Sequence, residues 1–303
     1  MKTKLTYFLC SIFMLTAFSL EAKPKAKRVV MIALDGISVE GLLKAKTPHI
    51  DALLKDGSLS LTTRDVMPSV TLPNWTSIMT GSGPEQHGVV DNGWTPKKIK
   101  LPAITTGKEG YYPSVFTLLK ENVKGVKTAF YYNWVNLFHP YNKKHLDEVC
   151  YLKEDAYIPY YEKAFDFIVE NKKNPTLVFL YSVHTDHAGH KHGWMSPEYI
   201  RSIEDADVQI GVFLDKMKNA DLYEKTHFMF LTDHGGIKRG HGGFTLKEME
   251  LPWGIVGPGV KKDFRITEPN NTVNTASTIL YLFGVKQPLP WTGEVIESIW
   301  GKK

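Results

Sequence analysis

Two segments of the sequence combine aspartate and histidine in a pattern that can bind a metal ion. In one segment, Asp233 and His234 follow a short apolar run, and His241 stands further along between two glycines. In the other segment, Asp186 and His190 follow a second apolar run. Carboxylate oxygens and imidazole nitrogens are common zinc ligands. An ordinary surface loop can contain the same residues, so the first segment alone does not establish a metal site.

A third aspartate makes a two-metal centre the better interpretation. Asp35 follows the apolar run 28–34, and seven of the eleven histidines lie from His184 to His241. In open α/β sheets ligands bind beyond the carboxyl ends of the strands, so we expect the three segments to converge. Three aspartates and three histidines exceed the needs of one tetrahedral ion but suit two ions, each with an open position. His187 and His192 are expected to lie outside the coordination shell or to face solvent.

Nearly continuous apolar runs must position these side chains. The runs at 28–34, 176–181 and 228–231 are typical of strands buried on both faces of a parallel sheet. Further strands are predicted at 127–132, at 253–256 and within 58–70, and helices at 47–56, 75–80, 113–119, 160–171, 196–217 and 275–283. Residues 134–157 are predicted to be irregular, residues 182–190 to form a loop after their strand, and Thr47 to cap the helix at 47–56. The alternation predicts an α/β fold with a mostly parallel central sheet and helices on both faces.

Length and composition describe a globular protein with an export signal. The chain has 303 residues, of which 43% are hydrophobic, enough for a large α/β domain. Lysines before a short apolar run, followed by small residues, identify 1–22 as a secretory signal peptide; an uncleaved anchor is the alternative. We interpret 23–303 as a single catalytic domain, exported to the periplasm or secreted. Cleavage would leave Cys150 as the only cysteine, which excludes a disulfide framework.

The charge pattern gives no sign of a macromolecular partner. The formal net charge is +5, and four positive charges of the mature chain crowd into residues 23–28. We interpret this basic stretch as a solvated linker. No binding of nucleic-acid polymers, no stable membrane insertion after signal cleavage and no obligate protein partner are therefore expected.

Five short motifs carry a family resemblance. They are ALDG at 33–36, TLPN at 71–74, PEQHGVVDN at 84–92, DHAGH at 186–190 and TDHG at 232–235. In order and spacing, the sequence resembles the type I phosphodiesterase/nucleotide pyrophosphatase family of the alkaline phosphatase superfamily. Members of that family use two zinc ions and a threonine or serine nucleophile. The resemblance implies an alkaline-phosphatase-like fold that extends from about residue 28 to the C-terminus.

The resemblance also implies how two Zn²⁺ ions would be bound. One ion would be held by Asp35, Asp233 and His234 and would touch the hydroxyl oxygen of Thr71. The other would be held by Asp186, His190 and a third histidine. The third histidine lies further from the Asp-His-Gly motif in many family members, but His241 is the only downstream candidate because no histidine follows it.

Thr71 and Asn92 match the catalytic residues of the family. Thr71 lies at a strand-to-helix junction and would attack phosphorus, which gives a covalent phosphothreonine; its hydroxyl could instead cap the helix. Asn92 would donate a hydrogen bond to a phosphate oxygen. Asn74 is expected to hold the turn before the helix, and His87 to fix its own loop and not to bind metal.

The predicted function is a secreted two-zinc phosphodiesterase/nucleotide pyrophosphatase, a hydrolase of small phosphoesters or nucleotides. The first alternative is a phosphate monoesterase of the same superfamily, and a less favoured one is a non-catalytic zinc or phosphate binder. A sulfatase is disfavoured because Thr71 cannot become the formylglycine that sulfatases need. A transferase that passes the phosphoryl group to an acceptor other than water stays open.

The sequence favours diesters over monoesters but does not identify the leaving group. Some threonine-dependent monoesterases of the superfamily carry a Lys and an Arg just after the strand that matches 127–132. Here the first cations of that region are Lys143 and Lys144. Substrate choice in the family is made by inserted loops, which here are 94–112 and 134–157. Their aromatic side chains could stack on a base or could pack in the interior, and the sequence leaves both open for Tyr112, Trp134, Phe138 and Tyr141.

Overall fold

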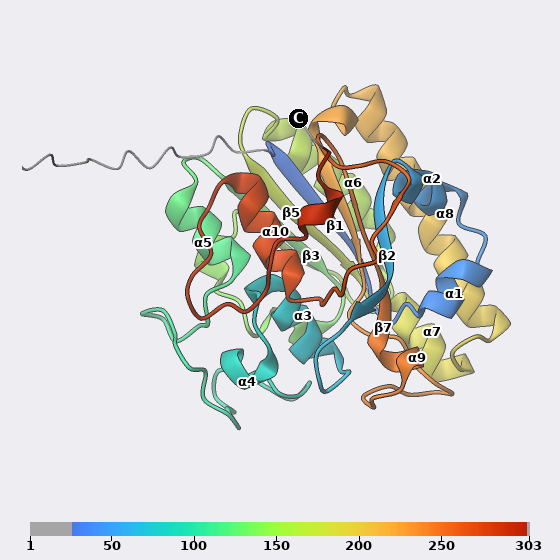
Figure 1. Cartoon of the computed structure of the whole chain (residues 1–303), viewed down its shortest axis with the longest axis horizontal. Helices are drawn as coiled ribbons and strands as arrows, with labels where there is room; N and C mark the ends of the chain where they lie inside the picture. The colour runs from blue at the N-terminus through green and yellow to red at the C-terminus, as the bar shows by residue number, and fades with distance from the viewer. Residues whose placement is uncertain (1–25, 302–303) are drawn as a thin grey trace, which may run out of the picture.

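The computed structural model describes residues 26–301, so the predicted signal peptide at 1–22 lies outside the described residues. Within 26–301, no helix has both the length and the apolar character that a membrane span requires. The described chain folds around one twisted sheet with helices on both of its faces (Figure 1).

The sheet has the strand order β4-β3-β5-β1-β6-β7-β2-β8. In chain order the strands are β1 (Arg28–Leu34), β2 (Gly57–Arg64), β3 (Lys127–Tyr132), β4 (Glu148–Tyr151), β5 (Thr176–Ser182), β6 (His227–Leu231), β7 (Glu250–Val256) and β8 (Phe264–Arg265). Only β7 runs against the direction of the others, because it pairs antiparallel with both β6 and β2. The prediction of a mostly parallel sheet is confirmed.

The pairing of β1 brings the candidate ligands to one edge of the sheet. β1 lies between β5 and β6 and is parallel to both, and Ala33 pairs with Tyr181 on one side and with Leu231 on the other. The carboxyl ends of all three strands therefore lie side by side. Asp35 and Asp233 each lie two residues beyond the Ala33–Leu231 pair, at the same level of the sheet.

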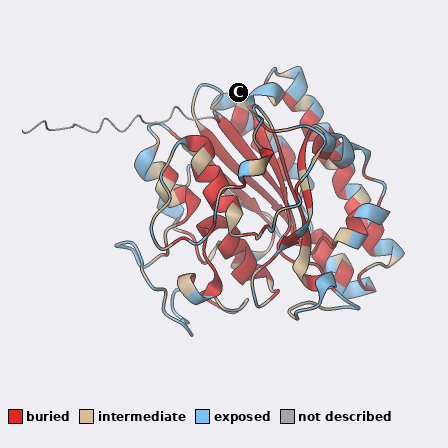
Figure 2. Ribbon diagram, in the orientation of Figure 1, coloured by how far each residue is buried: buried red, intermediate tan, exposed pale blue. Residues whose placement is uncertain are grey.

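Helices cover both faces of the sheet. The helices are α1 (Val39–Lys44), α2 (Pro48–Lys55), α3 (Thr71–Thr80), α4 (Pro84–His87), α5 (Val115–Asn122), α6 (Ile158–Glu170), α7 (His184–His192), α8 (Pro197–Asn219), α9 (Leu246–Met249) and α10 (Asn274–Phe283); short 3₁₀ turns are η1 (Val135–Phe138), η2 (Lys143–His145), η3 (Tyr223–Lys225) and η4 (Glu297–Ile299). Alternate residues of β1 point to opposite faces. Val29 and Met31 join the core under α3, α5 and α10, whereas Val30 and Ile32 join the core under α2, α6 and α8. Figure 2 shows the buried strands between these two layers.

Three local predictions need correction. The segment 134–157 is not wholly irregular, because its residues Glu148–Tyr151 form the edge strand β4 beside β3. Residues His184–His192 form the helix α7 and not a loop, although the run is polar and rich in histidine. Thr47 makes no side-chain cap bond to α2; the carboxylate of Asp207 in α8 accepts hydrogen bonds from the first backbone N–H groups of that helix instead.

Candidate active site

The first predicted ligand group is completely buried at the ends of β1 and β6. Asp35, Asp233 and His234 each have no solvent exposure. His234 Nε2 lies 3.4 Å from Asp35 Oδ1 and 3.3 Å from Asp233 Oδ2. The structure therefore brings together the three residues that the sequence assigned to one metal, and we call them the buried group.

Each aspartate of the buried group uses only one of its oxygens for hydrogen bonds. Oδ2 of Asp35 accepts from Tyr181 Oη and from Trp75 Nε1, and Oδ1 of Asp233 accepts from the Gly36 backbone N–H. The other oxygens, Asp35 Oδ1 and Asp233 Oδ2, are buried without a hydrogen-bond partner. Buried polar atoms are nearly always paired. These two oxygens are also the ones that face His234 Nε2, so they match the ligand atoms of a cation.

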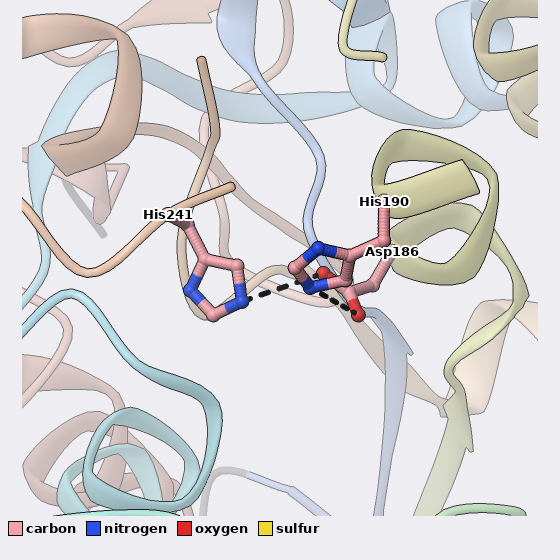
Figure 3. A group of neighbouring side chains, drawn as sticks. All are labelled: Asp186, His190 and His241. Carbon is pink, nitrogen blue, oxygen red and sulfur yellow. Dashed lines mark ion pairs between the residues drawn. The ribbon is translucent and has the colours of Figure 1, made fainter. Parts of the chain in front are cut away.

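The second ligand group joins α7 to the loop after β6. Figure 3 shows Asp186 and His190 on α7, with His241 entering from the loop. His190 Nε2 lies 3.5 Å from Asp186 Oδ2, and His241 Nε2 lies 3.7 Å from Asp186 Oδ1, which is buried and has no hydrogen-bond partner. The side chain of His190 is 44% exposed. We call these three residues the exposed group.

The three histidines all present the same ring nitrogen to the carboxylates. Each pairs its Nδ1 with a backbone carbonyl: His190 with Arg239, His234 with Gly235 and His241 with Ser69. A carbonyl accepts only from a protonated Nδ1, so Nε2 keeps its lone pair for a ligand. A hydrogen bond of this kind on the outer nitrogen is the usual arrangement around metal-binding histidines.

The donor sets fit two metal ions. In each group the three ligand atoms lie within 4.8 Å of one another. Two carboxylates and one imidazole form the buried set, whereas one carboxylate and two imidazoles form the exposed set; both are ligand sets that zinc accepts. Three protein ligands would leave one coordination position open on each ion.

The pKa values of the buried carboxyl groups also favour a bound cation. Burial raises the pKa of Asp35 and of Asp233 well above the ordinary value, and neighbouring carboxylates raise both further. Burial also raises the pKa of Asp186 to about 7, and it lowers the pKa of His234 well below its usual range. Such a cluster favours neutral carboxyl groups unless a cation is present. Divalent cations would stabilise the charged carboxylates in this low-dielectric setting.

Thr71 lies directly beside the buried group. It is the first residue of α3, and the extended residue Val70 occupies the cap position, so the Thr71 hydroxyl does not cap the helix. Its Oγ1 lies 3.2 Å from His234 Nε2. The residue is only 5% exposed.

Asn92 and Thr71 line the same hollow. This hollow, of about 200 Å³, is lined by Thr71, Asn92, Trp134, Val183, Asp186, His187, His190 and His241. Oδ1 of Asn92 accepts a hydrogen bond of 2.7 Å from the backbone N–H of Leu72. The Asn92 amide therefore has its Nδ2 donor left for a ligand in the hollow.

The residues near the motifs differ in whether they line the hollow or support the fold around it. His187 lines the hollow and pairs with Asp155 through Nδ1, whereas His192 is exposed and lies outside it. Asn74 holds the turn before α3, because its amide pairs with the backbone of Val66, Pro68 and Val70. The buried ring of His87 pairs with Ser77 and with the Val89 backbone N–H. The structural roles expected for Asn74 and His87 are confirmed.

Of the four candidate stacking aromatics, only Trp134 lines the hollow. Tyr112 and Tyr141 are buried, and their hydroxyls form hydrogen bonds inside the core. Phe138 packs against aromatic rings of β3. Lys143 and Lys144 lie away from the hollow, and Lys144 pairs with Glu109. Within residues 26–301, no Lys or Arg belongs to the lining.

Several residues that shape the site are not among those predicted from the sequence. Trp194 lies edge-on to His190 and near His241, and its Nε1 donates to the Gly36 carbonyl. A Cβ at Gly236 would lie 2.1 Å from the Trp194 ring, so Gly236, which follows the TDHG motif, makes room for this indole. Tyr181 and Trp75 bind the second oxygen of Asp35. Tyr181 could have been noticed, because it ends the β5 run.

Comparison with known proteins assigns the family. The profile of the family described as type I phosphodiesterase / nucleotide pyrophosphatase matches residues 29–245, more than half of the chain. The chain belongs to this family. The matched range contains every residue of both ligand groups, and the predicted family membership is confirmed.

Relatives in the family are larger proteins. The chain is 26% identical over 220 residues to ectonucleotide pyrophosphatase/phosphodiesterase family member 1 of Homo sapiens; the match covers 68% of the chain and 23% of that relative. An uncharacterized pyrophosphatase/phosphodiesterase of Schizosaccharomyces pombe is 28% identical over 235 residues, which cover 68% and 44% of the two proteins. The chain therefore spans less than half the length of these curated relatives.

Solved structures of the family share the fold. Murine ectonucleotide pyrophosphatase/phosphodiesterase 5, an inactive variant in complex with AMP, superposes with a TM-score of 0.75 at 18% identity, over 91% of this chain and all of that one. The human protein of the same name gives a TM-score of 0.74 at 16% identity with the same coverage of 91% and 100%. The α/β architecture predicted from the sequence is thus that of the family.

Proposed function

We propose that the protein is a zinc-dependent hydrolase that cleaves phosphodiester or pyrophosphate bonds through a covalent phosphothreonine at Thr71. The observation that supports this most strongly is the set of unpaired carboxylate oxygens of Asp35, Asp186 and Asp233. Each faces an imidazole Nε2 beside the Thr71 hydroxyl or the hollow next to it. Membership in the phosphodiesterase/nucleotide pyrophosphatase family gives independent support.

Two bound zinc ions would supply the Lewis acidity that makes a hydroxyl and a water molecule nucleophilic near neutral pH. The buried group would hold one ion and the exposed group the other. Thr71 Oγ1 forms a bond to phosphorus and loses its proton to solvent, and the leaving group departs with the electron pair of its P–O bond. Water then attacks phosphorus, Thr71 regains its hydroxyl, and a phosphomonoester is released. Asn92 Nδ2 donates to an equatorial phosphate oxygen and stabilises its growing charge.

The lining of the hollow favours a diester over a monoester. A monoester dianion carries one more charged oxygen, and sites that prefer it commonly add cationic side chains. Within residues 26–301, Lys and Arg are missing from the lining, while Trp134 and Val183 offer apolar surface to a second substituent. A small phosphoester or nucleotide suits this space. The AMP complex of the murine relative supports a nucleotide as the substrate class.

Turnover of matched substrates tests the proposal. With zinc present, an aryl phosphodiester and an aryl phosphomonoester that share one leaving group are compared by kcat/KM. We expect the diester to be the better substrate by about tenfold or more, which is roughly 1.4 kcal/mol of transition-state stabilisation. A tenfold advantage of the monoester favours the monoesterase alternative, and zinc binding without turnover of either substrate favours a non-catalytic binder.

Export completes the proposed function. Residues 1–22 would direct the chain to the periplasm or the exterior and then be cleaved, and the mature protein would act without an obligate protein partner. Several curated relatives carry the prefix "ectonucleotide" in their names, which supports an extracytoplasmic setting. N-terminal sequencing of the protein from the periplasm or medium should then begin near residue 23.

A further inference from the structure

Glu248 lies under the candidate active site without belonging to it. It is part of the short helix α9, its side chain is buried, and it is not among the residues lining the hollow. Its carboxylate accepts hydrogen bonds from the backbone N–H of Gly243 at 2.8 Å and from the backbone N–H and the hydroxyl of Thr245. Both partners belong to the loop that carries His241.

The backbone carbonyl of Glu248 binds two further segments of the site. It accepts from the Gly235 N–H at 2.6 Å and from the Ser69 hydroxyl at 3.1 Å. Gly235 directly follows His234. Ser69 lies two residues before Thr71, and its own carbonyl pairs with His241 Nδ1 at 2.9 Å. Three segments, which carry the proposed nucleophile and one histidine from each ligand group, therefore meet at Glu248.

The side-chain carboxylate of Glu248 contacts the His241 loop, whereas the other two segments contact its backbone carbonyl. His241 is the only ligand of the exposed group outside α7, and glycines stand at 240, 242 and 243. A Cβ at Gly243 would lie 2.7 Å from Glu248 Oε2, so the missing side chain allows the carboxylate to approach the backbone. Without that acceptor, the glycine-rich loop would keep the contact of His241 with Ser69 but would lose the hydrogen bonds that fix its backbone at Gly243 and Thr245.

We infer that Glu248 is a positioning residue that holds the His241 loop in its zinc-binding conformation and thereby sets the zinc affinity of the exposed group. The inference rests on the proposed two-zinc function. The buried group takes its ligands from the ends of β1 and β6 and does not need this loop. Loss of the Glu248 carboxylate should therefore weaken one zinc site and spare the other.

Asp207 offers a matched control elsewhere in the fold. It is a buried carboxylate that accepts from two backbone N–H groups, those of His49 at 3.3 Å and Ile50 at 2.7 Å. It acts between α8 and α2, away from both ligand groups. Glu248→Gln and Asp207→Asn each keep the size of the side chain and remove its charge, so both variants should lower the melting temperature.

The experiment titrates the metal-free mature protein with Zn²⁺ against a chromogenic chelator and measures each variant's thermal unfolding. For Glu248→Gln we expect the affinity of one of two zinc ions to fall by about tenfold or more, the range seen when residues that orient metal ligands are replaced. The other affinity should stay within about twofold of wild type. Asp207→Asn should leave both affinities unchanged.

Three outcomes would overturn the inference. They are wild-type zinc affinities in Glu248→Gln, equal weakening of both sites in that variant, and equal loss in Asp207→Asn, which would show that affinity follows global stability. A wild-type protein that binds fewer than two zinc ions contradicts the proposed function itself. The two failures are therefore distinguishable in the same titration.

Discussion

The two ligand groups differ in how the fold supports them. The buried group comes from neighbouring parallel strands, and its three side chains have no exposure to solvent. The exposed group comes from one helix and a glycine-rich loop, and the side chain of His190 is 44% exposed. Rigid strand ends position ligands before the metal arrives, whereas the loop must be held in place by hydrogen bonds. We therefore expect the buried group to bind zinc more tightly and to release it more slowly.

Removal of a buried ligand should have the largest effect. Asp233→Asn replaces a charged ligand but keeps an oxygen that can accept from the Gly36 N–H. We expect the loss of one zinc and a fall in kcat/KM of about 10³-fold or more, the scale seen when one member of an interdependent catalytic set is removed. Metal analysis and steady-state kinetics measure both. The comparison of the two groups is wrong if this variant keeps both ions and near-normal turnover.

Fold stability provides the control for that variant. In the metal-free protein, burial and then the neighbouring carboxylate of Asp35 raise the pKa of Asp233, so the neutral amide avoids the cost of a buried charge at this position. Metal-free Asp233→Asn should therefore unfold at the same temperature as metal-free wild type or higher. A lower melting temperature would mean that lost packing, and not lost coordination, explains the kinetic effect.

His241→Ala should affect only the exposed group. His241 Nε2 faces Asp186 Oδ1, and its removal leaves two protein ligands for that ion. We expect zinc content to fall by one and kcat/KM by about 10²-fold, because even replacement of a residue that orients a ligand costs 10- to 100-fold. A variant with two zinc ions and near-normal rate would show that another group completes the exposed site.

A chelator should remove zinc from the two groups at different rates. When excess chelator is added to the two-zinc protein, we expect biphasic release, with rates that differ by about tenfold, or roughly 1.4 kcal/mol in barrier. The fast phase should be lost in His241→Ala and the slow phase in Asp233→Asn. Release of both ions in a single phase from the wild type would contradict the proposed difference in rigidity.

The smallest effect is expected for the histidines that flank the exposed group. His187 lines the hollow and is half exposed, whereas His192, on the same helix, lies outside it. His187→Ala should raise KM measurably but by less than about fivefold, because contacts of solvent-exposed polar side chains contribute about 1 kcal/mol or less. His192→Ala is the matched control and should leave both KM and kcat unchanged. Equal effects of the two substitutions would show that the hollow is not the substrate site.

Much of the fold and of the candidate ligand set could be predicted because the signals are local. A buried parallel strand is a continuous apolar run, and a polar residue at its end is placed by that run alone, as for Asp35 after 28–34. The apolar signal failed for α7, whose nine residues carry four histidines and have no apolar stripe. It also failed for β4, a short edge strand with one partner, β3.

The sequence by itself determined the chemical types of the candidate ligands, the nucleophile candidate Thr71 and the strand ends at which they lie. Tertiary structure decided which oxygen of each aspartate stays unpaired, that His187 and not His192 lines the hollow, and that Trp134 alone of four aromatics does so. It also joined His241 to Ser69 across 172 residues of sequence. The physical reason is range: strand ends follow from neighbouring residues, whereas hydrogen-bond partners and cavity walls depend on distant segments that meet only when the core packs.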